Sequence, residues 1–194
     1  MTLRVKVAVL ISGRGSNMAA LIDASRAENY PAEIKLVVSN KADAPGLAKA
    51  RAAGVEAIAL SIKDFADKEA FEAAIDSELR RRGIEIICLA GYMRILGAAF
   101  VERWAGRILN IHPSLLPAYK GLGAHERALA DGVDEHGCSV HLVTSELDDG
   151  PGVVQARVPV LPGDDAQTLA ARVLVEEHRI YPEALARLAS EFLG

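Results

Sequence analysis

The chain has 194 residues, of which 51% are hydrophobic and 25% are charged, and its formal net charge at pH 7 is −4. This balance is typical of a one-domain globular protein, and the acidic net charge argues against a nucleic-acid partner. No apolar run approaches the ~20 residues that a membrane-spanning helix needs, and the first run is too short for a secretory signal. We therefore expect a soluble, cytoplasmic protein that binds neither nucleic acid nor membrane.

Up to about residue 111 the chain alternates between apolar runs and amphipathic stretches. The apolar runs are continuous, as in strands that are covered on both faces of a sheet. We expect strands over 5–12, 34–39, 55–60, 84–90 and 107–111, and helices over about 17–28, 46–53 and 67–82. This alternation predicts parallel strands joined by helical crossovers, with ligands at the carboxyl ends of the strands.

The last third of the chain has a different pattern. A short helix is expected over 122–131, followed by alternating stretches over 136–145 and 153–160 and a final helix over 165–193. The two alternating stretches flank a Gly/Pro turn at 149–152, so they predict a hairpin or a mixed sheet edge. The predicted fold class is therefore α/β: a single-domain Rossmann-like sandwich over residues 1–194, with a mostly parallel central sheet and a mixed C-terminal edge.

A glycine-rich loop, Ser12-Gly13-Arg14-Gly15-Ser16-Asn17, separates the first predicted strand from the first helix. Glycines allow close backbone approach, and the N–H groups of a helix N-terminus can bind an anion. The alternative is a plain tight turn with Ser16 or Asn17 as the N-cap. The loop lacks the Gly-Lys-Ser/Thr of a phosphate-binding P-loop, and Met18 stands where a dinucleotide fingerprint has its third glycine. The loop is therefore predicted to bind a single phosphomonoester.

The segment Asn110-Ile111-His112-Pro113 ends the fifth predicted strand. A spacing of two residues places Asn110 and His112 on the same side of an extended segment. An amide donor beside an imidazole suits acyl transfer, in which charge develops on a carbonyl oxygen and protons move. The alternative is structural: Asn110 caps the turn and His112 is a satisfied histidine. Nothing local singles out Asp148, which lies in a predicted loop.

No metal site is expected. The two cysteines lie in strand-like runs and are predicted to be buried thiols, and no histidine pair has metal-ligand spacing. The other histidines fall in helical stretches, at a turn or in an alternating strand: His125, His178, His136 and His141.

Six segments, in order along almost the whole chain, carry a family resemblance: LISGRGSN (10–17), SNKADA (39–44), LAGYMRIL (89–96), NIHPSLLPAYKGL (110–122), HGCSVHLVTSELDDGP (136–151) and EEHRIYPEAL (176–185). Together they resemble the phosphoribosylglycinamide formyltransferases of purine synthesis. The NIHPSLLP segment is typical of folate-dependent formyl-transfer and hydrolase domains, and the GRGSN loop narrows the resemblance further.

The resemblance implies an enzyme that transfers the formyl group of 10-formyltetrahydrofolate to the amine of 5-phosphoribosylglycinamide (glycinamide ribonucleotide) in de novo purine biosynthesis. Asn110, His112 and Asp148 match the family's catalytic trio, which stabilises a tetrahedral intermediate. The folate is a co-substrate, no metal is implied, and the protein is expected to be a monomer or a homodimer.

Binding residues are implied in the same way. Gly15, Ser16 and Asn17 match the loop that holds the acceptor's phosphate, and Glu177 matches an acid near the acceptor's amine. The residues that match the folate site include Lys68 near the folate tail, and the whole set is Lys68, Met93, Arg94, Ile95, Leu96, Asn110, Thr144, Ser145, Glu146, Leu147 and Asp148.

The chain departs from the family at two positions: Gly123 stands where a histidine is expected before His125, and Ser145 replaces an acid. Two related enzymes are alternatives, methionyl-tRNA formyltransferase and formyltetrahydrofolate hydrolase. The first usually carries a basic RNA-binding domain and the second an N-terminal regulatory domain, and we expect neither here. A non-catalytic nucleotide-binding module is the third alternative, and the missing third glycine and acidic ribose partner argue against it.

Overall fold

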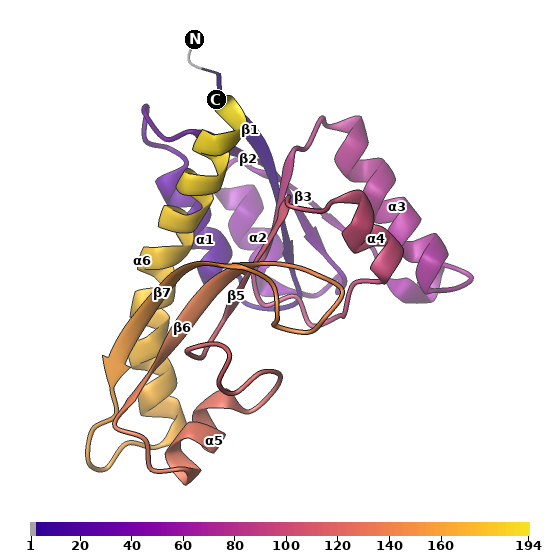
Figure 1. Cartoon of the computed structure of the whole chain (residues 1–194). Coiled ribbons are helices and arrows are strands. Elements are labelled where there is room, and N and C mark those ends of the chain that lie inside the picture. The colour runs from indigo at the N-terminus through magenta and orange to yellow at the C-terminus, as the bar shows by residue number, and fades with distance from the viewer. Residues whose placement is uncertain (1–2) are drawn as a thin grey trace.

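A seven-stranded sheet lies at the centre of the computed structural model, which describes residues 3–194 (Figure 1). Its strand order is β3-β2-β1-β4-β5-β6-β7. The strands are β1 (Val5–Ile11), β2 (Ala32–Ser39), β3 (Glu56–Ala59), β4 (Ile86–Leu89), β5 (Ile108–His112), β6 (Glu135–Leu142) and β7 (Gly152–Pro159). β1 to β5 run parallel, whereas β5 with β6 and β6 with β7 pair antiparallel. The predicted parallel sheet with a mixed C-terminal edge is confirmed.

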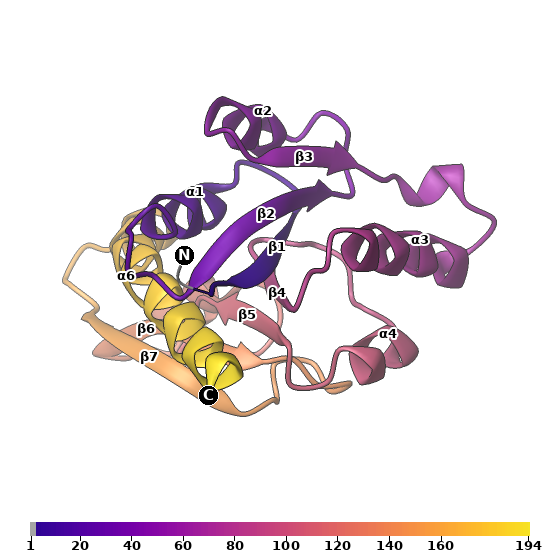
Figure 2. The ribbon, with the colours of Figure 1, turned by 90° about the horizontal axis from the view of Figure 1, so that it is seen from above.

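Helices cover both faces of this sheet (Figure 2). They are α1 (Ser16–Ala24), α2 (Pro45–Ala52), α3 (Lys68–Arg81), α4 (Ala98–Arg103), α5 (Ala124–Ala130) and α6 (Ala166–Leu193), with a 3-10 turn at Ile62–Asp64. α1, α2 and α6 pack on one face, and α3 and α4 on the other. Two separate apolar clusters result, one on each side of the sheet.

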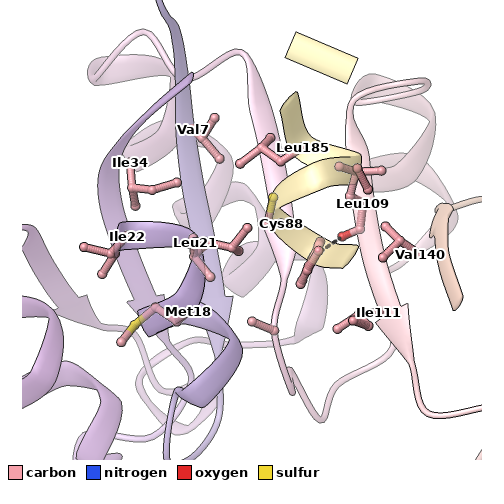
Figure 3. Close-up of a cluster of buried hydrophobic side chains, with 14 of the residues drawn as sticks. Val7, Met18, Leu21, Ile22, Ile34, Cys88, Leu109, Ile111, Val140 and Leu185 are labelled. Carbon is pink, nitrogen blue, oxygen red and sulfur yellow. Dashed lines mark hydrogen bonds between the residues drawn. The ribbon is translucent and has the colours of Figure 1, made fainter. Parts of the chain in front are cut away.

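The sequence of strand β1 is almost continuously apolar because its side chains are buried on both faces of the sheet. Val7 and Val9 belong to the cluster under α1 and α6, while Ala8 and Leu10 belong to the cluster under α3 and α4. Successive side chains on a strand point to opposite faces, so a strand covered on both faces has no polar side to show. Figure 3 shows the first of these clusters, in which Val7, Leu21 and Leu185 come from β1, α1 and α6.

Most boundaries lie within two residues of the sequence prediction, and the larger differences concern α4, β6 and α1. Helix α4 was not predicted, because its six residues are too few for a periodic apolar pattern to be recognised. Strand β6 ends at Leu142 rather than at residue 145, where the chain leaves the ladder for the loop that leads to β7. Helix α1 ends at Ala24 and not near residue 28.

The strand order reverses beside β1, because β2 and β3 lie on one side of it and β4 and β5 on the other. In open parallel sheets, ligands bind outside the carboxyl ends of the strands at such a point. The loops that follow β1, β4 and β5 meet at this edge, and they contain the glycine-rich loop, residues 90–97 and residues 113–123. Within residues 3–194, no helix combines the length and the apolar character needed to cross a membrane.

Candidate active site

The end of β5 presents Asn110 and His112, two positions apart on the strand and therefore on the same side. His112 is 7% exposed and Asn110 is half-buried. Asp148 comes from the loop between β6 and β7 and is also buried. Its Oδ2 lies 3.4 Å from His112 Nδ1, so the chain brings the three side chains of the expected trio together.

The two ring nitrogens of His112 face different partners. Nε2 lies 2.8 Å from the backbone oxygen of Tyr119, and because a carbonyl only accepts, the Nε2–H donates. Nδ1 is left facing the carboxylate of Asp148. A neutral ring of this tautomer would turn a lone pair toward the carboxylate, whereas an imidazolium has an N–H for each partner. The geometry suits a ring that can carry both protons.

Backbone conformation also marks this cluster. In the described part of the chain, only two residues other than glycine have a positive φ, Tyr119 at 54° and Asp148 at 51°. Both contact the imidazole of His112, one through its carbonyl and one through its carboxylate. Backbone strain of this kind persists only where surrounding contacts enforce it, and it gathers at functional sites.

The carboxyl group of Asp148 is held in its ionised form. Burial raises the pKa of Asp148, but the nearby His141 ring, the hydrogen bond from the Gly121 backbone and the nearby His112 ring together lower that pKa below its ordinary value. The Gly121 N–H donates to Oδ2 over 2.9 Å. Asp148 is therefore a stable negative charge beside the imidazole.

His141 belongs to the same cluster, although its sequence context indicates only a strand residue. It is buried and lies opposite Asn110 in the β5–β6 register. Its Nδ1–H donates to the Leu142 carbonyl over 3.0 Å, and its Nε2 lies 3.3 Å from Asn110 Nδ2 and 3.7 Å from Asp148 Oδ1. The only signal in the sequence is a histidine on an alternating strand, and register cannot be read from a single strand.

The glycine-rich loop leads directly into α1, and the N-cap is Gly15 rather than Ser16 or Asn17. Gly15 has a φ of 71°, and an added Cβ would lie 3.0 Å from Met18 Cε and 3.1 Å from Gly46 Cα. No side chain caps the first turn, so its backbone N–H groups are available to an anion. Both conditions for a phosphate site, a tight loop and open N–H groups, are present.

Glu177 lies against this loop although it is 160 residues from Asn17. The Asn17 Nδ2–H donates to Glu177 Oε2 over 2.9 Å, and Asn17 Oδ1 is buried without a partner among the described residues. Burial raises the pKa of Glu177, and the hydrogen bond from Asn17 only partly offsets it. An acid from α6 and the end of the glycine-rich loop therefore share one polar site.

The residues expected to contact folate form two groups. Met93 and Ile95 are 64% and 69% exposed in the loop after β4, Leu96 beside them is buried, and the guanidinium of Arg94 lies 5.6 Å from the Phe71 ring centre. Lys68 lies on α3, the helix that carries Phe71, and is exposed.

The second group lies in the loop after β6. Thr144 and Ser145 line a hollow of about 490 Å³ together with Val101, Val143, Pro151 and residues of α4. Glu146 and Leu147 follow on the exposed side of this loop, and Leu147 is 54% exposed. The lining of the hollow is mostly apolar.

The structure of residues 3–194 contains no group of three or more His, Cys, Asp or Glu side chains that could hold a metal ion. Both cysteines, Cys88 and Cys138, are free and buried.

Comparison with known proteins places these features in a family. The formyl transferase family matches residues 5–185 of the chain. The phosphoribosylglycinamide formyltransferase of Escherichia coli (strain K12) is 49% identical over 178 residues, which cover 92% of this chain and 84% of that protein. The crystal structure of phosphoribosylglycinamide formyltransferase from Brucella melitensis is 57% identical, with a TM-score of 0.93 over 96% of both chains.

Longer proteins match as well. The trifunctional purine biosynthetic protein adenosine-3 of Homo sapiens is 49% identical over 187 residues, which cover 96% of this chain and 18% of that protein. Among such trifunctional relatives, the chain spans between 14% and 19% of their length. The similarity there is to one segment of a larger protein.

Proposed function

The chain belongs to the formyl transferase family, and on this premise we propose that it transfers the formyl group of 10-formyltetrahydrofolate to the amine of 5-phosphoribosylglycinamide in de novo purine biosynthesis. The observation that carries the proposal is the clustering of Asn110, His112 and Asp148 at the end of β5. The relatives named phosphoribosylglycinamide formyltransferase support the choice of acceptor, since they match almost the whole chain.

The proposed reaction begins when the acceptor's amine attacks the formyl carbon. The carbonyl oxygen then becomes an oxyanion in a tetrahedral intermediate, and donors aimed at it lower the barrier. The Asn110 amide is a donor at the end of β5, and the His112 imidazolium contributes its positive charge, because both of its N–H groups face protein partners. When the intermediate collapses, the bond from carbon to the folate nitrogen breaks and that nitrogen takes a proton.

Asp148 supports this step electrostatically. An ionised carboxylate 3.4 Å from Nδ1 is placed to stabilise positive charge on the ring during the reaction. The attacking amine must also lose a proton, and the carboxylate is a base that can relay it through water. Asn110, His112 and Asp148 are thus assigned as the catalytic residues, with His141 as a neighbour to two of them.

The two substrates are assigned to different parts of the site. The acceptor's phosphate binds the N–H groups of Gly15, Ser16 and Asn17, and Glu177 lies toward its amine end. The folate binds between the loop after β4 and the loop after β6, with Lys68 near its tail. The exposed apolar side chains of Met93, Ile95 and Leu147 suit an aromatic ring.

We further propose that residues 1–194 act as one formyltransferase domain in the cytoplasm, as a monomer or a homodimer. The two substrates are small molecules, and we assign the protein no metal. Purified protein treated with a chelator should therefore keep its activity.

The test is a rate assay in which each substrate is omitted in turn. Formyl loss from 10-formyltetrahydrofolate should require 5-phosphoribosylglycinamide. Equal loss with and without the acceptor would instead indicate a hydrolase. Loss that requires an aminoacylated tRNA would indicate the tRNA-directed relative.

A further inference from the structure

Two buried side chains hold the segment from Met93 to Gly97, one at each end. Ser12, immediately before the glycine-rich loop, accepts a hydrogen bond from the Met93 N–H over 2.8 Å and donates one to Asn40 Oδ1 over 2.5 Å. Glu72, on α3, accepts a hydrogen bond from the Gly97 N–H over 2.8 Å. Both side chains come from elements far from this segment in sequence, and both are buried.

The residues between these two anchors are the ones assigned to the folate. Met93 and Ile95 are largely exposed, so few contacts of their own hold them in place. The Arg94 guanidinium lies over the Phe71 ring of α3, and this contact restricts the movement of the Arg94 side chain. Leu96 is buried in the apolar cluster under α3 and α4, so the shape that the exposed residues offer a ligand depends on this contact and on the two anchors.

Glu72 caps the N-terminus of α4, a helix that has no capping side chain of its own. Gly97 is the N-cap of α4, and no side chain of the helix caps it. In a capping box, an acid three residues into the helix accepts the N-cap N–H. Here the acid comes from α3 instead, and it also lies 3.7 Å from Lys68 Nζ.

A larger residue at position 97 would have to displace the Glu72 carboxylate. A Cβ added at Gly97 would lie 2.6 Å from Glu72 Oε2. The φ of Gly97 is −70°, which any residue can adopt, so the glycine is needed for space and not for conformation.

We propose that Glu72 is a positioning residue for the donor: by holding the start of α4, it keeps Met93–Leu96 in the shape that binds 10-formyltetrahydrofolate. The proposal rests on the function proposed above. A segment that is already in its binding conformation loses less conformational entropy when the ligand binds. Loss of the Glu72 contact should therefore weaken donor binding and leave the rate of the chemical step unchanged. Ser12 is the weaker test of this idea, because it precedes the loop assigned to the acceptor.

The first experiment compares steady-state constants for Glu72→Ala and Glu72→Gln. Loss of a buried hydrogen bond to a charged group should raise the KM for 10-formyltetrahydrofolate about tenfold in Glu72→Ala. The KM for 5-phosphoribosylglycinamide and kcat should stay within about threefold of the wild type. Glu72→Gln keeps an oxygen for the Gly97 N–H and should rescue most of the donor KM. Glu69→Ala, an exposed acid on the same helix, is the matched control.

The second experiment is a double-mutant cycle with Gly97→Ala. In the wild-type background the new methyl group meets the carboxylate, so this change should also raise the donor KM. In the Glu72→Ala background the space is free, and Gly97→Ala should add little. Strict additivity would overturn the proposal, because it would mean that the two residues act separately.

Binding can be followed apart from turnover. Trp104, the single tryptophan of the chain, is the C-cap residue of α4, so its fluorescence reports on this helix. Titration with tetrahydrofolate should give a Kd about tenfold weaker in Glu72→Ala, with an unchanged response in Glu69→Ala. An inactive wild type would refute the proposed function, whereas an active wild type with unaltered donor constants in Glu72→Ala would refute this inference alone. Equal loss for both substrates would assign Glu72 a merely structural role and would also refute it.

Discussion

At the scale of single residues, His112 is fixed by groups that its own strand does not supply. Its Nε2–H donates to the Tyr119 carbonyl, and its Nδ1 faces Asp148. Both partners lie in loops with a left-handed backbone conformation. The ring therefore cannot rotate without losing a contact, and its proton-bearing edge is directed by loop structure and not by β5 alone.

Asp148→Asn should separate catalysis from binding. The change keeps the size of the side chain but removes the negative charge beside Nδ1. We expect kcat to fall by about 10²–10³-fold while both KM values change little. Steady-state kinetics at several pH values will measure this.

The neighbouring Asp149→Asn is the control for this change, because Asp149 is exposed and pairs with Lys120. It should leave kcat near the wild-type value. Equal losses in the two variants would show that general negative charge in this loop matters, and not the contact with His112.

Gly15→Ala should act on the acceptor. The φ of 71° is unfavourable for alanine, and the added Cβ would come within 3.1 Å of the Gly46 backbone. Displacement of the loop should raise the KM for 5-phosphoribosylglycinamide about tenfold or more and leave the donor KM nearly unchanged.

Gly13→Ala is the matched control in the same loop. A Cβ there meets nothing within 4 Å, and the φ of Gly13 is not positive. It should behave as the wild type. If Gly15→Ala raised the donor KM alone, the assignment of this loop to the acceptor would be wrong.

At the scale of elements, the sheet was predictable from sequence and the loops were not. Continuous apolar runs indicate β1 to β5 because both faces are covered, and alternation indicates the mixed edge. The spacing of Asn110 and His112 predicts a shared side because strand geometry has a period of two. Asp148 was named only through family resemblance, and its place beside His112 depends on the path of a nine-residue stretch, 143–151, between two strands. His141 was missed because its relation to Asn110 is a matter of register between strands.

The contact between β6 and α5 should make the folded protein less stable in acid. His136, on β6, is buried, and its Nε2 lies 3.1 Å from His125 Nδ1 on α5. Burial, followed by the charge of His125, lowers the pKa of His136 to about 4. As the pH falls, the His136 side chain of the unfolded chain therefore binds a proton near pH 6.5, whereas that of the folded chain does so only near pH 4. The free energy of unfolding should therefore fall as pH drops from about 6.5 to about 4, by up to roughly 3 kcal/mol.

Urea unfolding of the wild type and of His136→Gln across this pH range measures the effect. The other titrating groups are common to both proteins, so the difference between the two curves reports on His136 and its contact with His125. The variant should have the flatter curve between pH 6.5 and 4. Two parallel curves would contradict the prediction.

At the scale of the whole molecule, α6 ties the two halves of the sheet together. Tyr181, fully buried on α6, donates its hydroxyl to the Leu89 carbonyl over 2.8 Å and approaches the Leu109 carbonyl at 3.1 Å. These carbonyls belong to β4 and β5, the strands whose ends carry the donor loop after β4 and the Asn110 and His112 side chains. The Tyr181 side chain of α6 thus links β4 and β5 close to the candidate active site.

Tyr181→Phe should cost stability more than activity. The buried Leu89 carbonyl would lose its hydroxyl donor, which should lower the free energy of unfolding by about 1–3 kcal/mol. Tyr92→Phe is the control, because the buried Tyr92 hydroxyl has no partner among the described residues. That change should be neutral or stabilising in urea unfolding. Equal destabilisation by both changes would show that the hydroxyl contacts of Tyr181 contribute nothing.

In the proposed reaction the formyl group passes intact from folate to the ribonucleotide amine. This transfer is tested most directly with 10-formyltetrahydrofolate that carries ¹³C in its formyl group, incubated with the purified chain and 5-phosphoribosylglycinamide and followed by NMR. We predict that the label appears as a formamide on the ribonucleotide at the rate at which tetrahydrofolate forms, and that Asp148→Asn slows both together. Label that appears as free formate, with the acceptor unchanged, would contradict the account.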